Sequence, residues 1–341
     1  MKTGGKRVLL FSLLIFSVVV FAVLELVAGS VHIPLETVFE TLFGSESVDQ
    51  RWQVIIFDSR MTRVCTAALA GSSLAVSGLL MQTFFSNPLA GPSVLGITSG
   101  SSLGVALLVL AGGGALFGFS YHLSIALAAI AGAFLILIGV MLVAQKLRDN
   151  VSLLIFGLMA GYLTSAIVTV LQSRTTKEAL QVFVHWGFGT FSTTSWSEIG
   201  FFAICVLLGL LLVLTLLKSL NAWMLGEDYA ETLGVSVRKT RILILVATGI
   251  LTGVTTAFCG PIAFLGLAVP HLVRGLFHSA DHKILIPGVI LTGMVLGLGC
   301  DWISRMPWSE SSLPLNAVTS LVGAPVVIWI IFMRNRRRSA L

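Results

Sequence analysis

The run VLLFSLLIFSVVVFAVLELV, from Val8 to Val27, decides the class of fold. Glu25 is its single charged residue, and about 20 apolar residues in a helix are what the hydrocarbon core of a bilayer requires. Basic residues precede the run and Ala28-Gly29-Ser30 follows it, an arrangement that imitates a secretory signal peptide. Because the run is longer than the apolar part of a typical signal peptide, we interpret it as an uncleaved first transmembrane span.

The composition of the whole chain supports the same class. Of the 341 residues, 56% are hydrophobic and 11% are charged, whereas soluble domains carry roughly 25% charged residues. So few charges do not cover a water-exposed surface, and lipid must therefore face much of the chain. Basic cytoplasmic loops account for the net charge of +6 better than nucleic-acid binding does. The four cysteines are scattered without a C-x-x-C spacing, which indicates packing residues and no metal site.

Similar apolar stretches recur along the chain. They predict an all-α integral membrane protein of about ten transmembrane helices, built as a single domain over residues 1–341. The predicted spans are 8–28, 62–84, 94–116, 122–144, 152–172, 199–217, 241–258, 262–277, 284–303 and 314–333. An even number of spans places both termini on the same side of the membrane.

The charges of the loops identify that side. With these spans, one face of the membrane collects Lys2, Lys6, Arg7, Lys146, Arg148, Lys218, Arg238, Lys239, Arg241, His278, His282, Lys283, Arg334, Arg336, Arg337 and Arg338. By the positive-inside rule this face is cytoplasmic, so we expect both termini in the cytoplasm. The opposite face carries 29–60, 173–198 and 304–313, which hold acidic residues and tryptophans typical of the membrane interface.

The chain contains a weak internal repeat. Gly91-Pro92-Ser93-Val94-Leu95-Gly96-Ile97 follows the second predicted span, and Gly260-Pro261-Ile262-Ala263-Phe264-Leu265-Gly266-Leu267 follows the seventh. The predicted topology places the two copies on opposite faces, as in an inverted-topology repeat with helix breaks at matching places. Chance similarity between Gly-Pro turns is the alternative.

The predicted spans offer little for ion coupling or bond chemistry. Ion-coupled transporters commonly use carboxylates or lysines at mid-depth. Here Glu25 and Asp301 lie near span ends, and we expect Asp301 to pair with Arg305 one helical turn away. The sequence has no G-x-x-x-x-G-K-[ST], so any ATP must bind another chain. An ion-coupled secondary transporter is the alternative function, and an intramembrane enzyme lacks a nucleophile–base pair.

Two polar segments interrupt this apolar pattern. Prolines and glycines between Gln82 and Gly96 must interrupt the helix, either as a plain reversal or as part of a pathway. The cytoplasmic loop at about 218–241 contains Leu225-Gly226-Glu227-Asp228-Tyr229-Ala230-Glu231-Thr232-Leu233-Gly234, which predicts a short amphipathic helix between glycines. Such a helix would dock a partner or lie in the plane of the lipid headgroups.

Several groups of residues together carry a resemblance to a known family. They are Arg60-Met61-Thr62-Arg63, Ala70-Gly71-Ser72-Ser73-Leu74-Ala75-Val76-Ser77-Gly78, Gln82, Asn87-Pro88-Leu89-Ala90, Leu233-Gly234-Val235, the second repeat copy with Val269-Pro270-His271, Arg274, Asp281-His282 and Leu285, and Gly323-Ala324-Pro325. The chain resembles, over nearly its whole length, the FecCD family. These are permease subunits of type II ABC importers for ferric siderophores, haem and cobalamin.

The resemblance implies an architecture and a set of partners. It implies the type II permease fold, as a homodimer of ten-helix subunits around a central pathway in the bacterial inner membrane. Two ATPase subunits would bind the cytoplasmic face, and a soluble substrate-binding protein would bind the outer face. ATP and magnesium would bind the ATPase subunits, so the chain itself would be no enzyme and hold no cofactor. Which metal chelate it carries is not fixed by the shared motifs.

The resemblance also implies roles for particular residues. The coupling helices of the family map onto Leu225 to Val235, with Leu225, Gly226, Glu227, Ala230, Leu233 and Gly234 as coupling residues. Arginines that grip the binding protein correspond to Arg60, Arg63 and Arg305, while snorkelling to the headgroups is the alternative for the first two. The turn before the fifth span gives Asn150, Val151 and Ser152 as an inner gate.

A large cargo needs a wide pathway that binds it weakly, so we expect small and uncharged walls. The candidates are Ser73, Ser77, Gly78, Met81 and Gln82 in the second span and Gly157, Gly161 and Ser165 in the fifth.

One segment departs from the family pattern. Family members often have E-[LI]-P-x-G before the last span, where this chain has Ser312-Leu313-Pro314-Leu315-Asn316 with Glu310 shifted by two positions. A role for that glutamate is therefore in doubt, and we expect Asn316 to supply the positive φ of the missing glycine.

Overall fold

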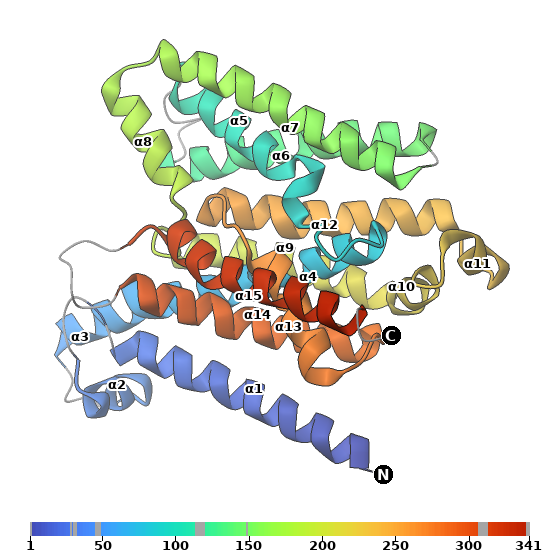
Figure 1. Ribbon diagram of the computed structural model, residues 1–341. Coiled ribbons are helices and arrows are strands. Elements are labelled where there is room, and N and C mark those ends of the chain that lie inside the picture. The colour runs from blue at the N-terminus through green and yellow to red at the C-terminus, as the bar shows by residue number, and fades with distance from the viewer. Residues whose placement is uncertain are drawn as a thin grey trace.

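The computed structural model describes residues 2–27, 29, 33–44, 49–112, 120–147, 149–305 and 313–338. Within these ranges every regular element is a helix, which agrees with the predicted all-α class. The long helices lie side by side along one direction (Figure 1). The elements are α1 (Lys2–Val27), α2 (Leu35–Leu42), α3 (Gln50–Val54), η1 (Ile55–Met61), α4 (Thr62–Phe84), η2 (Pro92–Leu95), α5 (Ile97–Val109), α6 (Tyr121–Lys146), α7 (Asn150–Ser173), α8 (Lys177–Gly187), α9 (Trp196–Thr215), α10 (Leu217–Trp223), α11 (Glu227–Thr232), α12 (Val237–Cys259), α13 (Leu265–Phe277), α14 (His282–Ser304) and α15 (Leu315–Arg338).

Seven helical stretches of the described chain are long and apolar enough to cross a membrane. They are Gly4–Val27, Gln50–Phe84, Tyr121–Lys146, Asn150–Ser173, Trp196–Thr215, Val237–Cys259 and His282–Ser304. The other three predicted spans fall on shorter apolar helices, Ile97–Val109, Leu265–Phe277 and Leu315–Trp329. The chain is therefore a multi-pass membrane protein.

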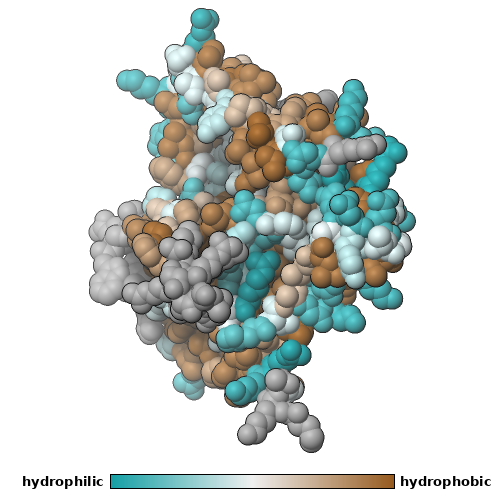
Figure 2. Space-filling view, turned by 45° about the vertical axis from the view of Figure 1, so that its right-hand side comes forward, coloured by the Kyte–Doolittle hydropathy of each residue, from teal (hydrophilic) through white to brown (hydrophobic). Residues whose placement is uncertain are grey.

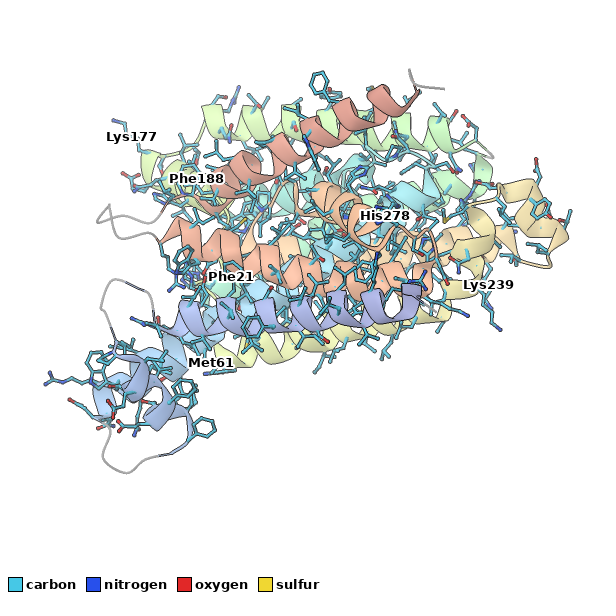
Figure 3. All side chains as sticks on the ribbon, turned by 60° about the horizontal axis from the view of Figure 1, so that its bottom comes forward. Phe21, Met61, Lys177, Phe188, Lys239 and His278 are labelled. Carbon is cyan, nitrogen blue, oxygen red and sulfur yellow. The ribbon has the colours of Figure 1, made fainter. Side chains whose placement is uncertain are left out.

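The helices define two ends of the bundle. The short helices α2, α3 and α8 lie at one end, while α10 and α11 lie at the other, together with the start of α1 and the end of α15 (Figure 1). Lys177 and Phe188 mark the first end, and Lys239 and His278 lie toward the second (Figure 3). We call these the α8 end and the α11 end. The start of α1 and the end of α15 thus lie at the same end of the bundle, which agrees with an even number of spans.

Helix α4 forms the centre of the bundle, packed against α12, α13 and α14. Glycines make this packing possible. A Cβ added to Gly78 would overlap the carbonyl oxygen of Gly266 in α13, and one added to Gly71 would overlap that of Gly293 in α14. Small residues let helix backbones approach closely where lipid gives no hydrophobic drive for association. Helix α1, by contrast, has 6% of its apolar window buried within the chain, so it lies at the periphery.

The second predicted span, 62–84, has the same bounds as α4. The structure adds a helical extension before it, because helix continues without a break from Gln50 through α3 and the wider π-helical turns of η1 into α4. Arg60 lies in this extension, where it is buried and donates to main-chain oxygens of α1.

The two Gly-Pro segments follow helices of matching length. Helices α4 and α12 have 23 residues each, and the helices after the breaks, α5 and α13, have 13 each. The breaks begin at opposite ends of the bundle, because the Phe84 carbonyl accepts from Trp223 beside α11, whereas the Cys259 carbonyl accepts from Thr190 beside α8. Matched lengths and opposite placement are what an inverted repeat predicts.

Candidate functional site

Buried charges gather at the α8 end, where α1, α4 and α14 meet. Arg63 donates from Nε and Nη2 to the two carboxylate oxygens of Asp301, at 2.5 and 2.7 Å. Arg305 forms an ion pair with Glu25 of α1. Its Nε also lies 3.6 Å from Oδ2 of Asp301. Charge-assisted contacts of this kind are stronger than neutral hydrogen bonds, and here they join three helices.

The partner of Asp301 differs from the one expected. We predicted a local pair with Arg305, and that contact is present. The closer partner is Arg63, which lies 238 positions away in the sequence, and Arg305 has its own carboxylate in Glu25. Sequence spacing within one helix therefore identified the weaker of the two contacts.

The three predicted docking arginines lie together at this end. Arg60 donates from Nη1 to the carbonyl oxygens of Leu26 and Val27, at 2.5 and 2.9 Å, and so satisfies the last turn of α1. Its exposed fraction is 5%, while the side chains of Arg63 and Arg305 are 15% and 11% exposed. Their role in docking stays a prediction. Within this chain their contacts are to carboxylates and main-chain oxygens.

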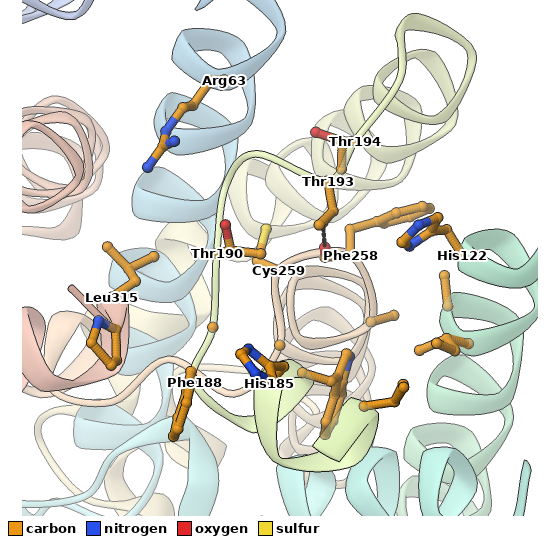
Figure 4. A pocket seen from close by; sticks show the side chains of 18 of the residues that line it. Arg63, His122, His185, Phe188, Thr190, Thr193, Thr194, Phe258, Cys259 and Leu315 are labelled. Atoms are coloured by element: carbon orange, nitrogen blue, oxygen red, sulfur yellow. Dashed lines mark hydrogen bonds between the residues drawn. The ribbon is translucent and has the colours of Figure 1, made fainter. Parts of the chain in front are cut away.

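A cavity of about 800 Å³ lies beside this cluster. Figure 4 shows Arg63, His122 and His185 around its margin and Phe258 and Cys259 from α12 on its wall. Aromatic, hydroxyl and imidazole side chains from α6, α8, α12 and the loop before α9 line it, together with Arg63 of α4, Ser304 of α14 and residues 313–315 at the start of α15. Among the described residues, no three His, Cys, Asp or Glu side chains are placed to hold a metal ion. Sequence patterns did not indicate this cavity, because segments far apart in the chain build it.

At the α11 end, several segments meet around Glu227, the first residue of α11. Asn150, the first residue of α7, donates from Nδ2 to Oε1 of Glu227 at 2.5 Å. Arg241 of α12 donates from Nη2 to the same carboxylate, at 3.0 Å to Oε2 and 3.3 Å to Oε1. Nη1 of Arg241 donates to the carbonyl oxygens of Leu147 and Ala144, at 2.8 and 3.4 Å. One carboxylate thus connects the predicted coupling helix to the predicted gate turn.

The end of α4 forms the apolar base of this junction. The carbonyl oxygen of Phe84 accepts from Trp223 Nε1 at 3.3 Å and from Asn150 Nδ2 at 3.4 Å. The rings of Phe84 and Trp223 stack with centroids 5.7 Å apart, and both side chains are buried. The start of α7 is therefore held against the central helix as well as against α11.

The predicted gate residues begin α7 with a charged cap. Asp149 accepts from the backbone N–H groups of Ser152 and Val151, at 2.8 and 3.1 Å. These bonds, led by the one from Ser152, hold the pKa of Asp149 below its usual range, so the cap is ionised at neutral pH. Val151 is 62% exposed, which leaves the first turn of α7 open to its surroundings.

The predicted amphipathic helix is present as α11. Gly226 and Gly234 flank it with φ angles of +106° and +81°, a region that favours glycine. Ala230 is buried, whereas Leu225 and Leu233 are 63% and 58% exposed, and Tyr229 beside them is also exposed. Figure 2, in which the right-hand side of Figure 1 comes forward, shows hydrophobic residues among hydrophilic ones over this end.

The predicted pathway residues of α4 lie in the packed interior. Ser73, Ser77 and Met81 are fully buried, and Gln82 is 3% exposed. Ser73 donates to the Leu251 carbonyl at 2.8 Å, and Gln82 donates to the Leu267 carbonyl at 3.1 Å. Each bond joins α4 to a neighbouring helix of the same chain. In this conformation all four side chains are packed within the bundle.

The predicted pathway residues of α7 are placed differently. Gly157 is buried against η2, where an added Cβ would lie 2.5 Å from the Val94 carbonyl oxygen. Gly161 is half-buried and Ser165 is exposed. The two sets of predicted lining residues are therefore not brought together, and an open surface is found on α7 alone.

Asn316 shows what replaces the expected glycine. It lies in the first turn of α15, so the predicted positive φ is wrong at this position. Its Oδ1 accepts from the backbone N–H of Ala263 at 3.1 Å, and the positive φ of +67° belongs to Phe264 in that segment. The side chain thus ties α15 to the turn before α13. Glu310 lies outside the described residues.

Sequence reasoning missed the contacts of Trp223 and Arg241. Arg241 had been counted only as one of many basic loop residues. It lies 14 positions after Glu227 and belongs to the next helix, so no spacing within one helix predicts their contact. Trp223 carried no recognisable pattern at all.

Long apolar helices, paired helix breaks and polar clusters at both ends define a multi-pass helical membrane protein. The sequence model of the FecCD transport family matches residues 15–333. The chain therefore belongs to the FecCD transport family, as the resemblance indicated.

Curated relatives agree with this membership. The chain is 36% identical over 293 residues to the vitamin B12 import system permease protein BtuC of Klebsiella pneumoniae, covering 86% of each chain. It is 34% identical over 286 residues to BtuC of Salmonella typhimurium, covering 84% of this chain and 86% of that one.

Solved structures agree as well. An ABC transporter of metal-chelate type in an inward-facing conformation matches with a TM-score of 0.83 and 32% identity, over 95% of this chain and 99% of the other. PsaBC from Streptococcus pneumoniae matches with a TM-score of 0.55 over 86% of this chain and 95% of the other. At 15% identity the second likeness concerns the fold alone.

Proposed function

We propose that this chain is the permease subunit of a type II ABC importer for vitamin B12 or another metal chelate, such as a ferric siderophore or haem. The observation that carries the proposal is a family match over residues 15–333, joined by BtuC relatives that cover most of both chains. The permease would supply the pathway, and a separate ATPase would bind ATP and magnesium, since the chain lacks a phosphate-binding loop. The ion-coupled alternative is not favoured by this membership.

The orientation follows from the charges of the loops. Ten spans, arranged as two inverted halves, would place the α11 end in the cytoplasm with both termini. Lys218, Arg238 and Lys239 lie at this end, which supports the assignment. The α8 end would then face the binding protein.

An ATPase subunit would dock on α11. Leu225, Tyr229 and Leu233 expose apolar surface at a helix that glycines separate from the bundle. Exposed apolar groups with charged neighbours such as Glu231 are typical of a protein interface. The same face would also suit the headgroup plane of the membrane, and recruitment of an ATPase separates the two readings.

The pathway would run along α7 between two copies of the chain. The exposed face of α7 carries the hydroxyl groups of Tyr162, Ser165 and Thr169 among apolar residues such as Leu163 and Ile167. The exposed residues of α9 from Gly200 to Leu214 are all apolar. Because lipid tails offer no hydrogen bonds, the hydroxyl-bearing face suits a partner subunit and a wet pathway, and the apolar face suits lipid.

The binding protein would contact the α8 end near Arg60, Arg63 and Arg305. These arginines already hold carboxylates or carbonyl oxygens of their own chain. Carboxylates on a binding protein would therefore have to share or displace those contacts. Such contacts would fix how the binding protein is oriented on the permease more than they would raise its affinity.

Co-purification with candidate ATPase and binding-protein subunits tests the proposal. We expect a stable complex whose ATP hydrolysis rises with loaded binding protein and whose cargo uptake into vesicles needs ATP. Uptake that survives ATP depletion and collapses with an uncoupler would instead establish the ion-coupled alternative. Charge reversal at Arg63 tests the docking site separately, with binding-protein affinity as the readout and complex stability as its control.

A further inference from the structure

We propose that Glu227 is a positioning residue that carries movement of α11 to the first turn of α7, and so couples the ATPase to the inner gate. This inference rests on the proposed function and names the group that performs one of its steps. The observation behind it is the junction in which one carboxylate binds both Asn150 and Arg241.

The carboxylate is placed to move with α11. Glu227 follows directly after Gly226, and α11 ends before Gly234, so both flanking positions are glycines of positive φ. Ala230 is the buried residue of this helix, which otherwise faces outward. A short helix that is loosely packed and bounded by two glycines moves as a unit more readily than a helix inside the bundle.

On the other side of the junction from α11, hydrogen bonds hold the start of α7 and the end of α6 in place. Asp149 caps α7 through two backbone N–H bonds, so the first turn of α7 and Asn150 move together. Arg241 holds the carbonyl oxygens at the end of α6 with the same guanidinium that binds Glu227. Both sides of the α6–α7 turn are thereby linked to one carboxylate.

The junction is partly shielded from water, which strengthens the contact between Glu227 and Arg241. The side chains of Arg241 and Glu227 are 9% and 27% exposed, so water screens their attraction only in part. The Phe84 carbonyl and the Trp223 ring close the junction from the side of α4. Displacement of α11 would therefore either pull the start of α7 with it or break a partly buried charged contact, and the second outcome is costly.

Three substitutions separate transmission from simple loss of structure. Glu227→Ala removes the contacts to Asn150 and Arg241 from the side of α11. Asn150→Ala breaks the link from the side of α7, away from the proposed ATPase surface. Lys283→Ala removes an exposed charge at the same end of the bundle, outside both the junction and α11, and serves as the control.

The experiment uses the complete complex in vesicles, with Val151→Cys introduced as a reporter at the gate. Cargo moved per ATP hydrolysed and the rate of thiol labelling at position 151, with and without ATP, are measured. We expect Glu227→Ala and Asn150→Ala each to lower transport per ATP about fivefold and to remove the effect of ATP on labelling. Lys283→Ala should behave like the parent. The double variant with Glu227→Ala and Asn150→Ala should be no worse than either single variant.

Two outcomes would overturn the inference. In the first, ATP changes labelling at position 151 equally in the parent and in both alanine variants. In the second, Glu227→Ala loses the ATPase while Asn150→Ala stays fully coupled, which would make the carboxylate a docking group. ATP-driven transport by the parent would leave the proposed function standing in both cases. A parent complex that neither binds an ATPase nor transports would instead remove the proposed function.

Discussion

At the scale of single residues, the fully buried carboxylate of Asp301 lies between two arginines at the α8 end, and its contacts hold helices of the bundle together. Its carboxylate receives two hydrogen bonds from Arg63 and lies near Arg305, whose other partner is Glu25. Taking such charges out of water is expensive, and the arrangement is stable only while every member has its partner. Removing one member therefore costs more than the cluster as a whole contributes.

We expect Asp301→Ala to lower the free energy of unfolding by about 3 kcal/mol, because the change leaves buried guanidinium groups without a carboxylate. Thermal unfolding of the detergent-purified protein, followed by tryptophan fluorescence, measures this change. Glu178→Ala removes an exposed carboxylate at the start of α8 and should cost less than about 1 kcal/mol. Equal losses in the two variants would contradict a stabilising ion cluster.

At the scale of elements, the crossing of α4 and α13 depends on two glycines in contact. The carbonyl group of Gly266 occupies the space where a side chain on Gly78 would begin. Backbones this close exclude water and gain dispersion contacts along the helices. The crossing also positions the broken segment before α13, which Asn316 ties to α15.

Gly78→Ala should lower the free energy of unfolding by about 2 kcal/mol, because the added methyl group forces the two backbones apart. Gly139→Ala in α6 is the matched control, since nothing lies within 4 Å of its added Cβ. There alanine should be neutral or stabilise the helix by up to about 1 kcal/mol. Unfolding of both variants in detergent measures the two changes in free energy. A larger loss of stability from Gly139→Ala than from Gly78→Ala would contradict the packing argument.

At the scale of the whole molecule, two long helices have open sides that the described chain does not cover. Helix α7 exposes the hydroxyl groups of Tyr162, Ser165 and Thr169 among apolar residues, while the exposed residues of α9 from Gly200 to Leu214 are all apolar. Under the proposed function, a second subunit would cover the open side of α7 and lipid would cover that of α9.

This division predicts the outcome of thiol labelling in membranes. A membrane-impermeant maleimide should modify Ser165→Cys on α7, because that position would border the pathway. It should leave Leu208→Cys on α9 unmodified in lipid, although that side chain is 57% exposed in the isolated chain. Ser73→Cys should also stay unmodified, since position 73 is buried. Protection of position 165 in every nucleotide state would contradict a pathway along α7.

Part of the candidate site was predictable from the sequence. The helix around Glu227 could be located because the glycines at 226 and 234 and the alternation of apolar and charged residues are local patterns. The lining role of Ser73 stays a prediction, because a small polar residue in a span serves equally well for helix packing. Whether such a residue lines a pathway or packs against another helix depends on the neighbour that its side chain faces.

The sequence by itself determined the helical class, the membrane environment, the family and the short helix at the α11 end. Each of these follows from composition, from hydropathy over about 20 residues or from adjacent turn residues. Only the tertiary structure decided that Arg63 pairs with Asp301 and that Asn150 meets Glu227. Those partners are far apart in the chain. Their meeting depends on how helices cross, and glycine contacts between distant helices set those crossings.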